Sequence, residues 1–222
     1  MNANRSTALP GREVQIPSGQ VTLEGELAIP AGARGLVIFA HGSGSSRHSP
    51  RNQFVAGTLR QAGLGTLLFD LLTSDEEIED QITAELRFNI QLLATRLVQA
   101  TNWASTQQEA RQLRIGYFGS STGGAAALVA AAELGKQTGA VVSRGGRPDL
   151  AGAALKRVTA PTLLIVGELD EPVIRMNEEA FDQLSCEKDL VIVPDATHLF
   201  EEPGALDEVA RLAANWFKDH LS

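Results

Sequence analysis

Short apolar runs alternate with longer, helix-length segments along most of the chain. The runs are continuously apolar, which is typical of strands that are buried on both faces of a parallel sheet. They lie at residues 35–40, 65–69, 115–118, 140–142, 162–166 and 190–193. A helical period is clearest at Leu86, Ile90, Leu93 and Leu97, and again at Leu206, Val209, Leu212, Ala213 and Trp216. This alternation predicts an open α/β sheet with right-handed crossovers and helices on both faces.

Two short β-rich segments precede this pattern, at residues 13–16 and 21–29. Pro17-Ser18-Gly19 separates them, which predicts an antiparallel hairpin. No linker interrupts the later alternation, so we expect residues 1–222 to form one α/β domain with a mostly parallel sheet. The stretch between residues 142 and 162 has room for one helix and its loops, so we expect no large cap domain.

Composition narrows the class of protein. A chain of 222 residues that is 43% hydrophobic can fill a full-sized core. Its net charge of -8 opposes binding to a nucleic-acid backbone. The longest apolar run, residues 125–132, is far shorter than the roughly 20 residues that span a bilayer. The N-terminus has no apolar segment of the secretory type, and there is one cysteine. We therefore expect a cytoplasmic protein without nucleic-acid or membrane partners, and the oligomeric state stays open.

The clearest chemical motif follows the strand at 115–118. Gly119-Ser120-Ser121-Thr122-Gly123 has the form G-x-S-x-G between a strand and a helix. The small flanking residues allow a sharp turn that exposes the hydroxyl of Ser121 at the edge of the sheet. A glycine-rich turn with incidental serines has the same pattern, so the motif needs support from elsewhere in the chain.

That support comes from two later strands. Asp170 follows the strand at 162–166, and His198 follows the strand at 190–193. The order Ser, Asp, His is the order that a catalytic triad has on this topology. Three further carboxylates near strand ends compete with Asp170: Asp70, Asp149 and Asp195. We rank Asp170 first, because the following Glu171-Pro172-Val173 leads directly into a helix, whereas Pro194-Asp195 is typical of a turn.

The first buried strand ends in His41-Gly42-Ser43-Gly44-Ser45-Ser46. Such a turn lets backbone amides approach a ligand closely, and we expect the Ser43 amide, or else that of Gly44, to be one oxyanion donor. The Thr122 amide at the start of the next helix is the expected second donor. We interpret His41 as a structural hydrogen-bonding residue, because it precedes the serine in the chain.

Four arginines follow strand carboxyl ends in this acidic chain: Arg47, Arg51, Arg144 and Arg147. We interpret them as candidate ligands for an anionic group of the substrate, because guanidinium binds carboxylate and phosphate in a bidentate manner. The alternative is that they pair with local acidic residues or backbone carbonyls.

These motifs resemble the α/β-hydrolase superfamily and, within it, the dienelactone hydrolase-like group. The resemblance rests on His41-Gly42, on the segment 119–124, on Asp170-Glu171-Pro172-Val173 and on Ala196-Thr197-His198-Leu199-Phe200. It implies an α/β-hydrolase fold and acyl transfer through Ser121, with His198 as base and Asp170 as the acid that orients it. The dienelactone hydrolases proper have cysteine at the elbow, where this chain has Ser121, and the only thiol, Cys186, lies elsewhere.

Three functions fit these residues. The first is a serine hydrolase of small esters or thioesters, and the second is an acyltransferase with the same triad. The third is a non-catalytic ligand-binding or protein-binding module on the hydrolase fold. No zinc, P-loop or dinucleotide motif is present in the sequence, so we expect no metal and no cofactor.

Overall fold

The computed structural model describes residues 11–222. Residues 1–10 lie outside the described part. They include most of the N-terminal segment in which we expect no secretory signal. The eight strands are β1 (Arg12–Ser18), β2 (Val21–Ala28), β3 (Gly35–Ala40), β4 (Gly65–Phe69), β5 (Arg114–Ser120), β6 (Thr138–Arg144), β7 (Thr162–Gly167) and β8 (Lys188–Val193). The α-helices are α1 (Pro50–Gln61), α2 (Ser74–Thr83), α3 (Ile90–Thr106), α4 (Thr122–Leu134), α5 (Glu171–Gln183) and α6 (Ala205–Leu221). Short 3-10 segments are η1 (Leu86–Phe88), η2 (Gly135–Gln137) and η3 (Pro148–Arg157).

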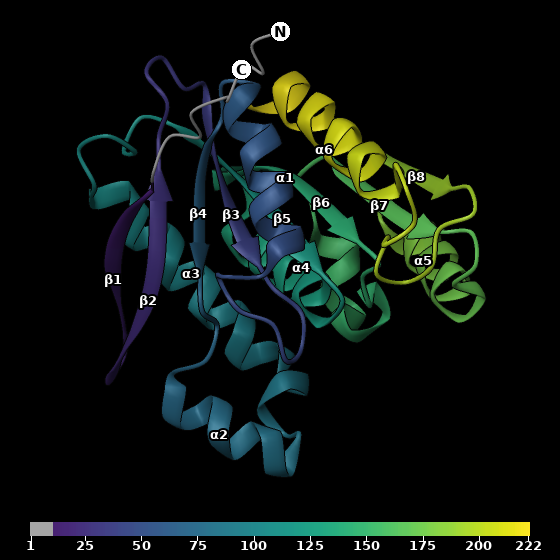
Figure 1. The fold of residues 1–222 in the computed structure, drawn as a ribbon, viewed down its shortest axis with the longest axis horizontal. Helices are drawn as coiled ribbons and strands as arrows, with labels where there is room; N and C mark the ends of the chain where they lie inside the picture. Colours follow the sequence, from purple (N-terminus) through teal and green to yellow (C-terminus); the bar gives the residue numbers. More distant parts are fainter. Residues whose placement is uncertain (1–10) are drawn as a thin grey trace, which may run out of the picture.

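The strands form one sheet in the order β1-β2-β4-β3-β5-β6-β7-β8. The β1–β2 and β2–β4 pairs are antiparallel, and all later pairs are parallel. The predicted N-terminal hairpin and mostly parallel sheet are therefore confirmed. In Figure 1, α1 and α6 lie on one face of the sheet and α3, α4 and α5 lie on the other.

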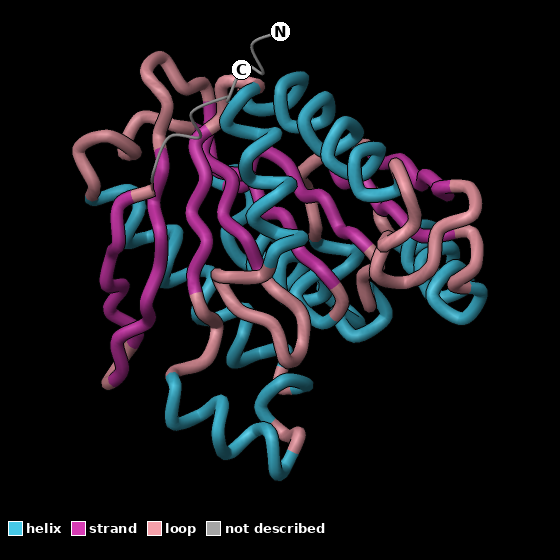
Figure 2. The backbone as a smooth tube through the Cα atoms, in the orientation of Figure 1, coloured by secondary structure: helices cyan, strands magenta, loops and turns pink. Residues whose placement is uncertain are grey.

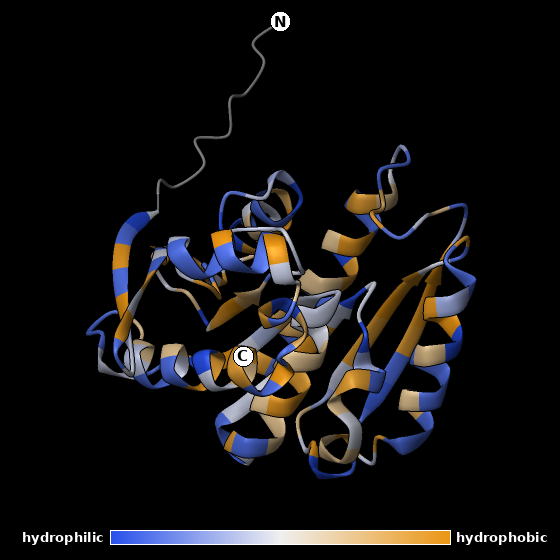
Figure 3. Ribbon diagram, turned by 90° about the horizontal axis from the view of Figure 1, so that it is seen from below, coloured by the Kyte–Doolittle hydropathy of each residue, from blue (hydrophilic) through white to orange (hydrophobic). Residues whose placement is uncertain are grey.

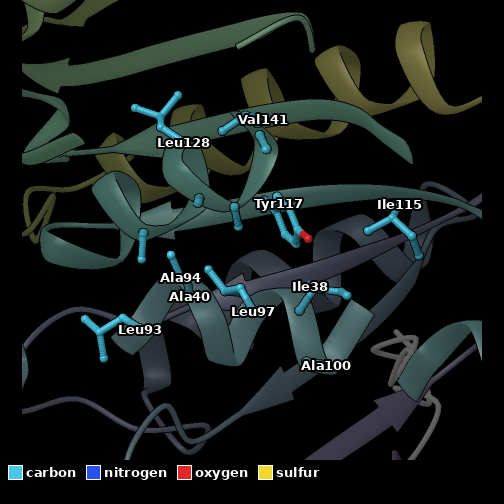
Figure 4. Close-up of a cluster of buried hydrophobic side chains, with 14 of the residues drawn as sticks. Ile38, Ala40, Leu93, Ala94, Leu97, Ala100, Ile115, Tyr117, Leu128 and Val141 are labelled. Carbon is cyan, nitrogen blue, oxygen red and sulfur yellow. The ribbon is translucent and has the colours of Figure 1, made fainter. Parts of the chain in front are cut away.

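Each face of the sheet has its own apolar cluster. Figure 4 shows part of the cluster under α3 and α4, where Ile38, Tyr117 and Val141 of the strands meet Leu97 and Leu128 of the helices. The second cluster packs the opposite face against α1 and α6. In Figure 3 the helices show both orange and blue, as expected for helices that place one side on the sheet and the other in solvent.

The structure corrects two details of the pattern. We expect residues 190–193 to be buried on both faces, but most of β8 is partly or fully exposed, because it is the edge strand of the sheet. The helical period that begins at Leu86 also starts too early. Leu86 lies in η1, and α3 begins at Ile90, where the Asn89 side chain accepts a hydrogen bond from the Leu92 amide at 3.1 Å.

In Figure 1 the arrowheads of β3 and β4 point down and those of β7 and β8 point to the right, so the twisted sheet has its carboxyl ends along the lower and right sides. Figure 2 shows the loops that leave the central strands at this edge, with α2 below them. The loops after β3, β5, β7 and β8 carry the residues that the sequence marks as chemically interesting. In open α/β sheets this edge is where ligands bind.

Candidate active site

Ser121 lies in a strained turn between β5 and α4. Its backbone has φ 51° and ψ −125°, in a region that side-chain-bearing residues rarely adopt. Such a conformation costs on the order of 1–3 kcal/mol and persists only where the surrounding structure holds it. Here the Ser121 carbonyl accepts a hydrogen bond from the Arg147 amide at 3.0 Å, and α4 begins with the next residue.

This turn requires glycine at three positions, because a side chain there would collide with neighbouring atoms. A Cβ on Gly123 would lie 2.1 Å from the Ala40 carbonyl oxygen, and one on Gly119 would lie 2.6 Å from the Gly123 oxygen. A Cβ on Gly42 would lie 3.0 Å from the Ser121 Cβ. The loop after β3 is therefore packed directly against the candidate nucleophile.

His198 and Asp170 are in contact across the ends of β7 and β8. The His198 Nδ1 atom lies 2.6 Å from the Asp170 Oδ2 atom. The Asp170 side chain is 13% exposed and that of His198 is 41% exposed, so the imidazole reaches solvent while the carboxylate is mostly covered. This contact leaves Nε2 of His198 for a second proton partner.

The competing carboxylates have other partners. Asp70 pairs with Arg47, and Asp149 accepts two hydrogen bonds from the Arg147 guanidinium at 2.9 and 2.8 Å. Asp195 has φ 57°, as expected of a tight turn. Among the residues that the structure describes, Asp170 is the one of these four carboxylates that contacts His198.

Ser121 and His198 line one cavity of about 240 Å³. The hydrogen bonds of residues 11–222 include none between these two side chains. Hydrogen bonds of this type are often long before a substrate binds. The cavity is somewhat smaller than typical drug-sized sites of ~300–1,000 Å³, which favours a small substrate.

Two backbone amides, in the loop after β3 and at the start of α4, are the candidate oxyanion donors. Neither the Ser43 nor the Thr122 amide has a hydrogen-bond acceptor within the described residues. The two hydroxyls, Ser43 Oγ and Thr122 Oγ1, lie 3.2 Å apart and join the loop after β3 to the start of α4. Two unpaired amides beside a serine nucleophile are the arrangement of an oxyanion hole.

His41 lies beneath this loop and has a structural role. Its Nδ1 atom donates to the Gly42 carbonyl oxygen and its Nε2 atom accepts from the Leu71 amide, both at 2.9 Å. Burial lowers the pKa of His41, which keeps the ring neutral. The expectation of a structural histidine is confirmed.

The four arginines fall into two groups. Arg47 pairs with Asp70 and Glu24, and Arg147 pairs with Asp149. Arg51 and Arg144 both line the cavity that contains Ser121. Sequence position alone does not separate these groups, because all four follow strand ends.

Two glutamates that the sequence analysis did not single out hold the histidine loop. Glu202 accepts hydrogen bonds from the amide and hydroxyl of Thr197, and Glu168 accepts one from the Asp195 amide at 2.9 Å. Glutamate is a polar residue of a kind common on any protein surface, so the sequence distinguishes these two only by their position near His198.

Residues 11–222 contain no helix long and apolar enough to cross a bilayer. No group of three or more potential metal ligands occurs within this range.

The sheet order, the elbow after β5 and the loops after β7 and β8 define an α/β-hydrolase fold. Comparison with known proteins shows that the chain belongs to the dienelactone hydrolase family, whose sequence pattern matches residues 23–221.

Two relatives are similar in sequence over nearly the whole chain, and a third protein shares only the fold. The crystal structure of a dienelactone hydrolase from Anabaena variabilis is 60% identical, with a TM-score of 0.94 over 96% of this chain and 100% of that chain. A Mycobacterium tuberculosis protein named putative phosphoribosyl transferase is 53% identical over 100% of this chain and 49% of its own length. The chain therefore spans about half the length of that relative. Est1E from Butyrivibrio proteoclasticus shares the fold, with a TM-score of 0.78 at 18% identity over 95% of this chain and 98% of that chain.

Proposed function

We propose that this protein is a serine hydrolase that cleaves small esters or thioesters through an acyl-enzyme on Ser121. The observation that carries the proposal is the convergence of four loops, those after β3, β5, β7 and β8. The strained Ser121, the His198–Asp170 pair and the two unpaired amides belong to loops at one edge of the sheet. Family membership supports hydrolysis as the class of reaction.

In the first step, His198 accepts the Ser121 proton through Nε2 while the serine oxygen attacks the ester carbonyl. The amides of Ser43 and Thr122 donate hydrogen bonds to the oxyanion that forms. His198 then gives the proton to the departing alcohol or thiol, which leaves the acyl group on Ser121. Asp170 holds the imidazole in the tautomer that carries hydrogen on Nδ1 and stabilises the imidazolium.

In the second step, water attacks the acyl-enzyme with His198 again as base, and the acid product leaves. Hydrolysis and acyl transfer differ only in whether water or another acceptor takes part here. Product analysis with added alcohols or amines separates the two, because a transferase gives mainly the transferred acyl product.

The M. tuberculosis relative that is named putative phosphoribosyl transferase is about twice as long as this chain, so its name describes a longer protein. We base the proposal on the hydrolase family because its pattern covers residues 23–221 of this chain.

Labelling with a fluorophosphonate probe tests the proposal. We expect the wild type to be labelled once and Ser121→Ala not at all, with both proteins equally folded by circular dichroism. No labelling of the folded wild type would favour a binding module. Labelling of Ser121→Ala would show that another serine is the nucleophile.

A further inference from the structure

Arg144 is a buried cation without a charged partner in the part of the chain that the structure describes. It is the last residue of β6 and is 7% exposed. Its Nε and Nη1 atoms have no hydrogen-bond partner within residues 11–222, and the guanidinium carbon lies 5.8 Å from the centre of the Phe200 ring. Burial lowers the pKa of Arg144 to about 10, so the group still carries its charge at neutral pH. Buried, unpaired charges cost several kcal/mol, and proteins seldom retain them without a ligand or partner.

A second cation lies nearby. Arg51 lines the same cavity as Arg144, and its positive charge contributes to the lowered pKa of Arg144. Arg51 is in the first turn of α1, and this turn contains no acidic residue. Because a helix N-terminus carries partial positive charge, this is an unfavourable place for a cation. Glu201 lies 2.9 Å from Arg51 Nη1, whereas the ion pairs formed among residues 11–222 include none of Arg144.

Both arginines line the cavity that contains Ser121 and His198. The same cavity is lined by Ser43, Ser45 and Ser49, whose hydroxyls are further hydrogen-bond donors. Two positively charged guanidinium groups therefore lie beside the candidate nucleophile, in a chain whose net charge is -8.

The number of donors favours phosphate over carboxylate. A carboxylate has two oxygen atoms, whereas a phosphate monoester presents three and carries a charge of about −1.5 to −2 at pH 7. One guanidinium without a partner, a second with one partner and several hydroxyls match the larger and more highly charged group.

We propose that Arg144 and Arg51 bind a phosphate group carried by the substrate. The assignment of this group to the substrate rests on the proposed hydrolase function. The anion site itself rests on the arginines alone and can be tested without catalysis.

The first experiment measures phenylphosphonate binding to Ser121→Ala by titration calorimetry. We expect binding that weakens at least tenfold when Arg144→Met is added, and less when Arg144→Lys is added, because lysine keeps the charge but not the planar fork. Arg211→Gln is the matched control, since Arg211 pairs with Glu208 on the exposed face of α6. It removes the same charge and should leave the affinity unchanged.

Three results would overturn the proposal: unchanged affinity in Arg144→Met, equal weakening by Arg211→Gln, or benzoate binding as tightly as phenylphosphonate.

The midpoint of thermal unfolding gives a second readout. Arg144→Met replaces an unpaired charge with an apolar chain, so its midpoint should equal or exceed that of the wild type. Phosphonate should raise the midpoint of the wild type but not of the variant. If Arg144→Met does not fold, Arg51→Gln takes its place, because the Arg51 side chain is 35% exposed. An Arg51→Gln affinity equal to that of the wild type would then reject the site.

The second experiment compares 4-acetoxyphenyl phosphate with the neutral 4-methoxyphenyl acetate. We expect Arg144→Met to lower kcat/KM for the phosphorylated ester at least tenfold more than kcat/KM for the neutral ester. Equal losses for both esters would instead place Arg144 at the reacting carbonyl and overturn the proposal. If the hydrolase function itself fails, neither ester is cleaved by any variant, while phosphonate binding still depends on Arg144.

Discussion

Two parts of the carboxyl edge of the sheet differ in whether their charged groups are paired. In the part that follows β4, buried or half-buried charges are paired. Arg96 binds Glu76 through two nitrogens at 2.7 and 2.6 Å, and Arg87 binds the fully buried Asp80 through its backbone amide and side chain. We call this part the paired rim, comprising residues 70–96.

In the part formed by the loops after β5, β6, β7 and β8, three groups around the cavity stay strained, unpaired or exposed, although Arg147 and Asp149 pair with each other. Ser121 has a positive φ, Arg144 has no charged partner among residues 11–222, and the His198 side chain is 41% exposed. We call this part the open rim. The paired rim therefore satisfies its own charges, whereas the open rim leaves Arg144 without a charged partner among residues 11–222 and the His198 side chain partly exposed beside the cavity that Ser121 lines.

The largest expected effect is on the open rim. Asp170→Asn should lower kcat by about 10³–10⁴-fold, because an amide favours the wrong imidazole tautomer. Stability should change little, since the Asp170 side chain does not cap α5. Steady-state kinetics and urea unfolding measure the two effects. Asp149→Asn is the control, and a similar loss of kcat there would contradict the assignment of the acid.

On the paired rim, Asp80→Ala should lower the free energy of unfolding by about 3 kcal/mol. The change leaves the Arg87 guanidinium and amide without their acceptor. Glu79→Ala, an exposed change on the same helix, should stay within about 0.5 kcal/mol. Chemical denaturation provides the measurement, and equal effects of the two variants would refute the role assigned to the buried pair.

Gly42→Ala probes the contact between the loop after β3 and the nucleophile. The added methyl group would lie 3.0 Å from the Ser121 Cβ and 3.1 Å from the Ser120 oxygen, so the loop must shift. We expect kcat/KM to fall by about 10²-fold, because small displacements of oxyanion donors are costly. Gly57→Ala in α1 meets only the end of the Arg60 side chain and should leave kcat/KM unchanged. Full activity of Gly42→Ala would show that this loop does not position the site.

The smallest effect is that of Glu76→Gln, which should cost about 1–2 kcal/mol at pH 7, because Glu76 is partly exposed. The Arg96 hydrogen bonds lower the pKa of Glu76 in the folded state. The carboxylate therefore stabilises the fold fully above its unfolded pKa of about 4.3, and this contribution is lost as the pH falls through the lower folded value. Urea unfolding at several pH values should show that the difference between the two proteins begins to shrink below about pH 4 and disappears once the pH lies below the folded pKa of Glu76. A difference that persists there would contradict the ion-pair explanation.

Much of the architecture follows from local pattern. Each predicted central strand is found, because a short, continuously apolar run such as residues 35–40 is typical of a strand that is buried on both faces. The turn around Ser121 is also predictable, since glycines at 119 and 123 are needed for its close backbone contacts. The placement of Asp170 and His198 after later strands follows from topology, because parallel strands end at a common edge.

The charges at that edge were decided by the tertiary structure. Arg47 and Arg144 both follow strand ends, and no local pattern tells them apart. Arg47 meets Asp70 and Glu24, each 23 residues away, and the partner of Arg51 is 150 residues away. The exposure of β8 likewise depends on its place at the sheet edge.

The amino-acid sequence thus determined which elements form and where the candidate serine, histidine and aspartate lie among them, because periodicity and turn chemistry act over a few residues. Which arginines are neutralised and which face the cavity was decided only by packing. Ion pairing depends on distances in space between residues that are far apart in the chain.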